Sequence, residues 1–207
     1  MELNLAGKTA LITGGSKGIG LAIKNALEKE GVICVSASRE SGYDFTDPDD
    51  IDSAKELVNG IDILINNVGG GGTWTKDFDD IFCKNYWVMQ ELTYTYLKKK
   101  RKWGRVITIS SIFGKEKGPN PVFTATKASQ IAFMKCLSGI FKGITFNTIC
   151  PGLTDVGKPM DLNLVSDERN VGKPEDVAGI VTFLCSDLAS HIDGACITVD
   201  GGESHAF

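Results

Sequence analysis

The sequence predicts an α/β fold, in which a doubly wound parallel sheet carries helices on both faces. Two observations lead to this class. Short apolar runs alternate along the chain with stretches of helical periodicity, which is typical of parallel sheets. The apolar character is continuous within each run, as expected of strands buried on both faces. The candidate strands are Thr9–Thr13, Val32–Ser38, Asp62–Asn66, Arg105–Ser110, Ile144–Cys150 and Ala195–Val199.

Length and composition predict one globular domain over residues 1–207, with a sizeable core. Hydrophobic residues make up 42% and charged residues 23% of the chain, which is ordinary for a soluble protein. The net charge of −4 gives no electrostatic case for a nucleic-acid partner. The basic run Lys98–Lys102 is expected to end a helix, where cations suit the helix dipole.

No apolar run near the start is long enough for a signal peptide or a membrane span, so we expect a cytoplasmic protein with no membrane partner. The six cysteines form no CxxC pair, and most lie in apolar segments. They are expected to be small buried thiols in a reducing compartment. His191 and His205 are too few and too isolated for a metal cluster, so no metal site is expected.

The connection after the second candidate strand is unusually short. A full helical crossover between parallel strands needs about a dozen residues, and the segment Arg39–Asp44 is shorter than that. We therefore expect the helix between the second and third strands to be missing or reduced to a tight loop.

A glycine-rich loop, TGGSKGIG at Thr13–Gly20, follows the first strand and opens the first helix. Glycines at this place allow a tight turn and a close backbone approach, and the helix N-terminus offers free N–H groups to a pyrophosphate. A loop of this kind without a ligand is possible in isolation. The strand and helix on either side instead favour a Rossmann-type dinucleotide site.

Further motifs follow in a fixed order. They are NNVGG at Asn66–Gly70, KNYW around Asn85, ISSIFG at Ile109–Gly114, CPGLT at Cys150–Thr154, and GKPEDVAGIVTFLCSD and ITVDGG near the C-terminus. Together with the glycine loop, this set resembles the short-chain dehydrogenase/reductase family over nearly the whole chain. The resemblance implies a dinucleotide-dependent oxidoreductase that interconverts a carbonyl and an alcohol. The chain is noticeably shorter than most members, which agrees with the shortened crossover.

The end of the second strand bears on the choice of cofactor. An acidic residue there would bind the adenosine ribose diol and repel a 2′-phosphate, but this chain has Ser38 and Arg39. A hydroxyl and a guanidinium both suit a 2′-phosphate, and Lys17 adds positive charge. We therefore expect NADP, with NAD as the alternative. Arg39 could instead be solvated or paired with Glu40.

The resemblance implies which residues hold the dinucleotide. Asp44 matches the acidic position beside the adenine ring, with Phe45 after it, and Lys127 matches a lysine that holds the nicotinamide ribose. The complete expected set is Gly14, Ser16, Lys17, Gly18, Ile19, Gly20, Ser38, Arg39, Asp44, Phe45, Asn67, Val68, Gly69, Lys127, Pro151, Gly152 and Thr154.

The resemblance also implies a catalytic set of asparagine, serine, tyrosine and lysine, and here the chain departs from the pattern. Asn85, Ser111 and Lys127 match, with Ser110 as a competitor for the serine role. Alternation along a strand points two successive serines to opposite faces. The tyrosine position is Phe123, four residues before Lys127 and so on the same face of a helix. A phenylalanine ring has a similar shape but no proton to give.

Three explanations of Phe123 stay open. The chain is an engineered Tyr→Phe variant of an active reductase, a natural relative that senses dinucleotide without catalysis, or an enzyme with another proton donor. Tyr86 or a water held by Ser111 would be such a donor. We favour the first explanation, because the rest of the site is kept. The expected partner is a small carbonyl or alcohol compound, and loss of the acid implies low activity.

The sequence says less about substrate and assembly. Gly69–Gly72 followed by Trp74 suggests an open approach with one aromatic wall, which suits a small polar or sugar-like carbonyl compound among many others. The segment after Thr154, with Pro159, Met160, Leu162 and Leu164, matches the family's substrate lid. The helix expected around Phe123–Phe141 is apolar on several faces, and the resemblance implies that it meets a second copy in a homodimer or homotetramer.

Overall fold

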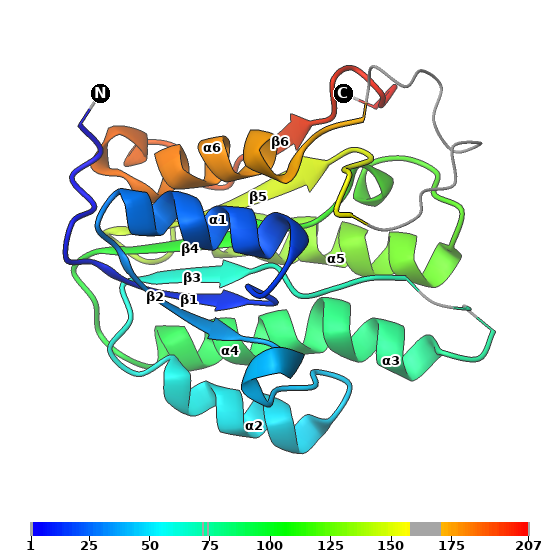
Figure 1. The fold of residues 1–207 in the computed structure, drawn as a ribbon, viewed down its shortest axis with the longest axis horizontal. Helices are drawn as coiled ribbons and strands as arrows, with labels where there is room; N and C mark the ends of the chain where they lie inside the picture. Colours follow the sequence, from blue (N-terminus) through cyan, green and yellow to red (C-terminus); the bar gives the residue numbers. More distant parts are fainter. Residues whose placement is uncertain (1, 72, 74, 158–170, 207) are drawn as a thin grey trace.

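A computed structural model describes residues 2–71, 73, 75–157 and 171–206. Its centre is one parallel sheet with strand order β2-β1-β3-β4-β5-β6 (Figure 1). Each strand coincides with a candidate run to within one residue at either end. The strands are β1 (Thr9–Thr13), β2 (Ile33–Ala37), β3 (Ile63–Asn66), β4 (Gly104–Ile109), β5 (Ile144–Pro151) and β6 (Cys196–Val199).

Helices cover both faces of the sheet, as the alternating pattern predicts (Figure 1). On one face, α1 (Gly18–Lys29) and α6 (Pro174–Cys185) pack over a core that includes Ile12, Ile23 and Val181. On the other face, the core includes Leu64, Leu92 and Phe146, and it is covered by α2 (Pro48–Leu57), α4 (Val88–Leu97) and α5 (Pro121–Leu137). The short helix α3 (Phe78–Phe82) precedes α4. None of the helices that the structure describes is long and apolar enough to cross a membrane.

The crossover after β2 differs in part from the expectation. The segment expected to be a tight loop is a single 3-10 turn, Arg39–Ser41. A helix does connect β2 to β3, however, because α2 begins at Pro48. The expectation that no helix lies between these strands is therefore wrong. Its start signals are present in the sequence: Asp47 caps the helix by accepting a hydrogen bond from the Asp49 N–H, and proline stands at the first turn.

The shortened crossover leaves β2 at the edge of the sheet. In the dinucleotide-binding order 3-2-1-4-5-6 a further strand lies outside the second, whereas here β2 is the last strand on its side and β3 pairs directly with β1. The side chains of Ile33 and Val35 are consequently 62% and 41% exposed. The missing strand explains how a chain of 207 residues keeps the rest of the architecture.

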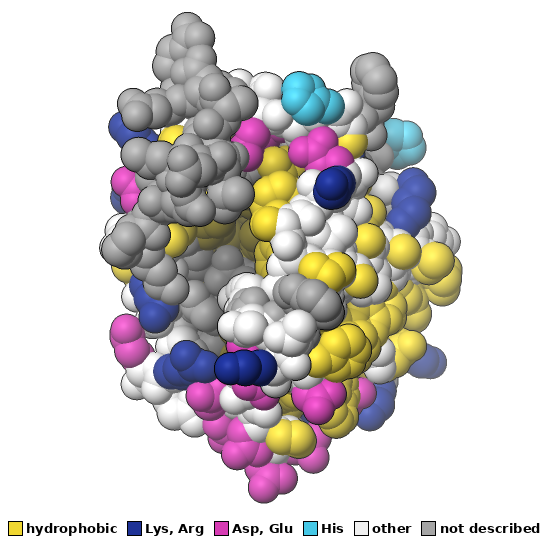
Figure 2. Space-filling model, turned by 90° about the vertical axis from the view of Figure 1, so that its right-hand side faces the viewer, with side chains coloured by type: hydrophobic (Ala, Val, Ile, Leu, Met, Phe, Trp, Pro, Cys, Tyr) yellow, Lys and Arg dark blue, Asp and Glu magenta, His cyan; other side chains and the backbone are white. Residues whose placement is uncertain are grey.

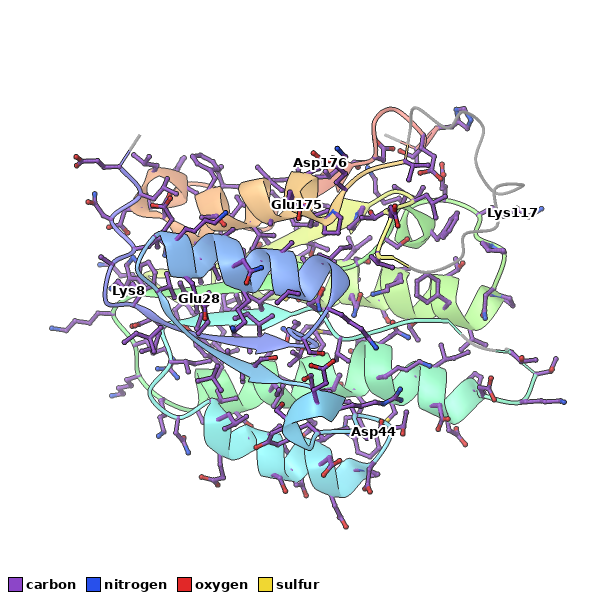
Figure 3. The ribbon with its side chains drawn as sticks, in the orientation of Figure 1. Lys8, Glu28, Asp44, Lys117, Glu175 and Asp176 are labelled. Atoms are coloured by element: carbon purple, nitrogen blue, oxygen red, sulfur yellow. The ribbon has the colours of Figure 1, made fainter. Side chains whose placement is uncertain are left out.

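The amino ends of the strands are held by a buried cation. Arg105, at the start of β4, is 2% exposed and donates hydrogen bonds to the Ser186 carbonyl at 3.1 and 3.3 Å. Its guanidinium lies 4.3 Å from the Trp103 ring, and Lys8 lies over the same ring at 4.1 Å. Figure 3 shows Lys8 and Glu28 at this end and Asp44 near the opposite one. The amino end is therefore structural, and the candidate site lies at the carboxyl ends of the strands.

Candidate active site

Figure 2 looks onto the carboxyl ends of the strands, and a hollow opens on this face. Two adjoining cavities lie here, of about 480 and 290 Å³. We call them the loop cavity and the lysine cavity, after the glycine loop and Lys127 that line them. They share the lining residues Ile19, Asn67, Gly69, Gly70 and Val156. The two cavities therefore form one continuous depression.

The glycine loop is fixed to the end of β3. Thr13 Oγ1 accepts hydrogen bonds from the N–H groups of Asn67 and Val68, at 2.9 and 3.0 Å. The Asn67 side-chain amide donates in turn to the carbonyls of Thr13 and Gly14. Gly14 has a φ of 68°, a left-handed conformation that glycine adopts without strain. Thr13, which the sequence analysis did not assign, thus holds the loop in place.

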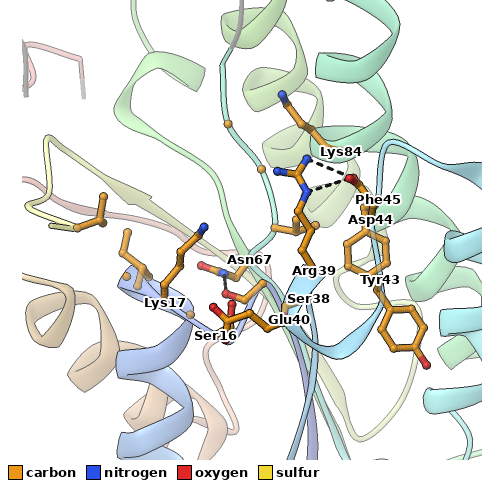
Figure 4. Close-up of a pocket in the computed structure, with 18 of the residues that line it drawn as sticks. Ser16, Lys17, Ser38, Arg39, Glu40, Tyr43, Asp44, Phe45, Asn67 and Lys84 are labelled. Carbon is orange, nitrogen blue, oxygen red and sulfur yellow. Dashed lines mark hydrogen bonds and ion pairs between the residues drawn. The ribbon is translucent and has the colours of Figure 1, made fainter. Parts of the chain in front are cut away.

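The loop cavity brings together the residues expected around the adenosine half of a dinucleotide. Figure 4 shows Lys17 and Arg39 on separate elements around it, with Lys84 beyond Arg39. Tyr43 and Lys84 are additional lining residues that the sequence analysis missed. The expected residues that line this cavity are Gly14, Ser16, Lys17, Gly18, Ile19, Gly20, Ser38, Arg39, Asp44, Phe45, Asn67, Val68 and Gly69.

Arg39 is paired with Asp44, and not with the neighbouring Glu40. Its Nε and Nη2 donate to the two carboxylate oxygens of Asp44 at 2.9 and 3.2 Å (Figure 4). The hydrogen bond from Arg39 is the main reason that the pKa of the Asp44 carboxyl is lowered. The Arg39 side chain is still 71% exposed. Its guanidinium is thus held at the rim of the loop cavity with much of its surface open to a ligand.

The two candidate serines bond to different elements. Ser110 Oγ donates to the Lys127 carbonyl at 2.9 Å and so ties the end of β4 to α5. Ser111 Oγ accepts from the Phe113 N–H at 3.2 Å, capping a short 3-10 turn. Both residues border the lysine cavity. Because Ser111 Oγ acts as an acceptor in this cap, its own O–H can be turned toward the cavity.

Phe123 and Lys127 lie one turn apart on α5, as their spacing requires. Lys127 Nζ lies 5.5 Å from the centroid of the Phe123 ring and donates to the Ile109 carbonyl at 2.9 Å. The side chain of Lys127 is 4% exposed. Burial lowers the pKa of its ammonium group to about 7, because the charged form loses its hydration. Both residues line the lysine cavity.

Asn85 lies in a π-helical turn, Cys83–Trp87, between α3 and α4. Its amide donates to the carbonyls of Gly70 and Ile81 at 2.8 and 2.7 Å, and its Oδ1 accepts from the Gly70 N–H at 3.1 Å. A Cβ atom added at Gly69 would lie 2.6 Å from Asn85 Oδ1 and 3.2 Å from Lys127 Nζ. Asn85 and Lys127 therefore converge on Gly69, although Asn85 is not among the residues that border either cavity.

Tyr86 is turned away from this site. Its ring packs against Phe82 and Phe133, with centroids 5.4 and 6.0 Å apart. The idea that Tyr86 supplies a proton is therefore wrong on geometry, and no tyrosine is among the described residues around the lysine cavity. Adjacent helical residues point in different directions, but the sequence does not show which of Asn85 and Tyr86 faces the site, because that depends on how the helix is rotated about its axis.

The wall opposite α5 follows β5. Pro151, Gly152 and Thr154 line the lysine cavity, as expected. Glu203, from the segment after β6, lines it too, and its Oε2 accepts the Leu153 N–H at 2.7 Å. The sequence analysis missed this carboxylate, because the residues after the ITVDGG motif carried no signal of their own.

Some expectations fall on residues outside the described part of the chain. Gly72 and Trp74, expected to form an open approach with an aromatic wall, are two of them, and Pro159, Met160, Leu162 and Leu164 of the expected lid are the others. Among the residues that the structure describes, no group of His, Cys, Asp and Glu is arranged to hold a metal ion.

Comparison with known proteins identifies relatives over the whole chain. A family model described as Enoyl-(Acyl carrier protein) reductase matches residues 42–204. The 3-oxoacyl-[acyl-carrier-protein] reductase FabG of Aquifex aeolicus (strain VF5) is 32% identical over 252 residues, covering 98% of this chain and 99% of the relative. That aligned length exceeds the 207 residues of this chain. The difference agrees with the missing edge strand.

Two solved structures are similar in fold and coverage. L-sorbose reductase from Gluconobacter frateurii, complexed with NADPH and L-sorbose, superposes with a TM-score of 0.88 at 25% identity and covers 100% of both chains. 3-Ketoacyl-(acyl-carrier-protein) reductase from Brucella melitensis, complexed with NADH, has a TM-score of 0.86 at 26% identity and covers 97% of this chain and 100% of its own.

Proposed function

The chain belongs to the short-chain dehydrogenase/reductase family, and from that premise we propose that it binds NADPH and a small carbonyl or alcohol compound but transfers hydride slowly. It is an NAD(P)-dependent oxidoreductase by family. One observation carries the proposal. The loop cavity and the lysine cavity are continuous, so a single extended dinucleotide can reach from Arg39 to Lys127.

The residues present fit NADP. Gly70 and Gly71 border the loop cavity, and an added Cβ at either one would meet nothing within 4 Å, which leaves a ligand room to approach the backbone. Lys17 and Arg39 offer the cations that a 2′-phosphate requires. When bound, the nicotinamide supplies or accepts the hydride. The neighbouring cavity then has to hold the carbonyl compound.

The roles of the chain's own side chains follow from their positions. We assign Lys127 the donation of a hydrogen bond to a ribose hydroxyl and Ser111 the donation of one to the substrate oxygen, because both residues line the lysine cavity. Asn85 holds the Gly70 backbone beside them. Phe123 fills the position of the proton donor without a proton. Loss of a general acid typically costs about 10²–10⁴-fold in rate, and we therefore propose low activity for this chain.

A second candidate function is a dinucleotide sensor that performs no chemistry. The observation in its favour is that no tyrosine borders the described lysine cavity. The two functions differ in one respect. A sensor needs no substrate site, so a tyrosine at position 123 would give it no activity. An impaired reductase would gain activity when a tyrosine at position 123 restores the general acid.

The lysine cavity favours a small polar carbonyl compound such as a ketose. Most of the lining is apolar, but Glu203 provides a fixed carboxylate acceptor whose Oε2 is anchored by Leu153. Hydroxyl groups on a substrate can donate to such a carboxylate. An acyl chain offers no donor. We therefore rank polyhydroxy ketones above acyl thioesters as substrates.

We also propose that the chain forms a homodimer or homotetramer through the face made by α3, α4 and α5. The rings of Phe78, Phe82 and Tyr94 there are 55%, 41% and 47% exposed. A cavity of about 820 Å³ lies between α3 and the first turns of α5. Exposed aromatic surface of this kind marks an interface more often than free surface. Figure 2 shows hydrophobic side chains gathered beside the hollow.

The function is tested by titrating the protein with NADPH and NADH, and then by following NADPH oxidation with ketoses and with short 3-oxoacyl thioesters. We expect saturable NADPH binding and slow oxidation that is faster with ketoses. Absence of NADPH binding would refute the function as a whole. Binding with no turnover, even after a tyrosine is placed at position 123, would favour the sensor.

A further inference from the structure

Cys150 and Cys196 form a thiol pair between β5 and β6. Their sulfur atoms are 3.3 Å apart. In the strand register Cys150 lies beside Thr198, and Cys196 lies beside Thr148. Cys150 therefore lies two residues along β5 from Thr148, the residue beside Cys196. Because side chains alternate along a strand, an offset of two keeps both cysteine side chains on the same face of the sheet. The pair contrasts with Cys136 on α5, which is exposed, so the expectation of uniformly buried cysteines is wrong.

The pair lies directly behind the lysine cavity. Cys150 is the residue before Pro151, which lines that cavity. The backbone N–H of Ser111 partly offsets the rise in the pKa of the Cys150 thiol. Lys127 is close enough to interact electrostatically with the same sulfur. A chemical change at Cys150 would therefore be felt by the backbone and side chains that form the candidate substrate site.

The two thiols differ in access and in acidity. Cys150 is fully buried, whereas Cys196 is half-buried and open to a small oxidant. The sulfur–sulfur hydrogen bond with Cys150 lowers the pKa of the Cys196 thiol, and the nearby Lys115 ammonium acts in the same direction. The same hydrogen bond raises the pKa of Cys150. Because Cys196 is the less buried of the two, it is the thiol that reacts first, and Cys150, 3.3 Å away, is placed to resolve it.

We propose that Cys150 and Cys196 are an oxidative modification site, which a hydroperoxide converts into a disulfide that disturbs the lysine cavity. The Cys196 thiolate attacks one peroxide oxygen, the O–O bond breaks, and sulfenic acid and hydroxide form. The Cys150 sulfur then attacks the Cys196 sulfur and expels the sulfenic oxygen as water. In total, two thiols and one hydrogen peroxide give one disulfide and two waters.

The disulfide changes the site because the sulfurs must approach. A disulfide bond is about 2.05 Å long, shorter than the 3.3 Å that separates the thiols. β6 is a short strand at the edge of the sheet, and Glu203 follows soon after it. β5 ends at Pro151, and Gly152 follows it. Formation of the disulfide therefore shifts the walls of the lysine cavity that carry Glu203 and Pro151. The expected effect of this shift on ligand binding rests on the proposed function.

The site itself is tested without any assay of activity. The full-length protein is treated with increasing hydrogen peroxide, blocked with an alkylating agent, digested without reduction and examined by mass spectrometry. We expect a linked peptide pair containing Cys150 and Cys196, reversed by a thiol reductant. Cys196→Ser and Cys150→Ala should each abolish the linked pair, while the matched control Cys136→Ser should form it as readily as the unchanged chain.

The outcomes separate the site from the function. Linkage of other cysteines, or oxidation of Cys196 to a sulfinic acid with Cys150 left reduced, would overturn the proposal. With the disulfide in place, we expect several-fold weaker binding of NADPH or of a ketose, restored by reduction and absent in Cys196→Ser. Unchanged binding in the linked protein would overturn the effect on the cavity. Absence of NADPH binding before oxidation would instead count against the proposed function.

Discussion

Lys127 Nζ lies 5.5 Å from the centroid of the Phe123 ring and is held there by a 2.9 Å hydrogen bond to the Ile109 carbonyl. A cation in the place that would acidify a phenol thus faces a ring that has no hydroxyl. The lysine keeps this position through the backbone of β4, so it does not depend on the residue at position 123.

Phe123→Tyr should raise NADPH-dependent turnover by about 10²–10⁴-fold, the usual contribution of a general acid. The new phenol would lie beside Lys127, and a neighbouring cation lowers the pKa of a phenol. Turnover is measured as loss of NADPH absorbance with a panel of ketoses and oxoacyl thioesters. Cofactor affinity should stay the same.

The double variant Phe123→Tyr with Lys127→Met is the control for that gain. It should lose most of the added activity, since no neighbouring ammonium group then lowers the pKa of the phenol at position 123. If the unchanged chain already turns over as fast as the tyrosine form, another proton donor exists and the role given to position 123 is wrong.

Arg39→Ala should weaken NADPH binding by about 10-fold or more and leave NADH binding nearly unchanged, because a hydrogen bond to a charged group contributes about 1.5–3 kcal/mol. Calorimetric titration with both cofactors measures this. Asp44→Asn is the matched variant: it removes the negative charge that competes with a phosphate for Arg39, and NADPH affinity should stay equal or rise. Equal losses for the two cofactors would contradict the role of Arg39.

The buried Lys127 predicts a dependence of stability on pH. The pKa of its ammonium group is about 7 in the folded protein, against an ordinary value of 10.5. Between these values the unfolded chain binds a proton that the folded chain does not, so the free energy of unfolding rises with pH across that window. Urea unfolding of the unchanged chain and of Lys127→Met should show the unchanged chain gaining relative stability from pH 7 to 10. A constant difference would mean that the ammonium is not desolvated.

Arg105→Met should lower the free energy of unfolding by about 2–3 kcal/mol, because it leaves the buried Ser186 carbonyl without its donor and removes the cation from the Trp103 ring. Lys8→Ala removes the other cation near the same ring and should cost less than about 1 kcal/mol, since Lys8 is only half-buried whereas Arg105 is buried. Urea denaturation of both variants measures the difference. Similar losses would show that the stacking, not the buried hydrogen bonds, dominates.

The strands and the cofactor loop were open to prediction because their signals are local. A continuous apolar run such as Thr9–Thr13 needs only burial on both faces to become β1. The glycines of the loop that follows β1 are required by the tight turn, in which Gly14 has a positive φ. The helix α2 has equally local signals in Asp47 and Pro48, but the short segment Arg39–Asp44 before it favours a lost crossover, and the two local patterns therefore give opposite predictions.

The contacts between neighbouring strands and the directions in which individual side chains point could be learned only from the tertiary structure. The sequence by itself determined the fold class, the positions of the strands and the presence of Phe123 one turn before Lys127, because these follow from periodicity and residue type. Only the folded chain decided that Tyr86 points away from the cavity, that Asp44 binds Arg39, that Glu203 enters the site and that Cys150 meets Cys196. The Asp44–Arg39 pair depends on the path of the turn between these two residues. The other three depend on how distant segments pack, and local sequence does not encode the relative position of two strands or the rotation of a helix about its axis.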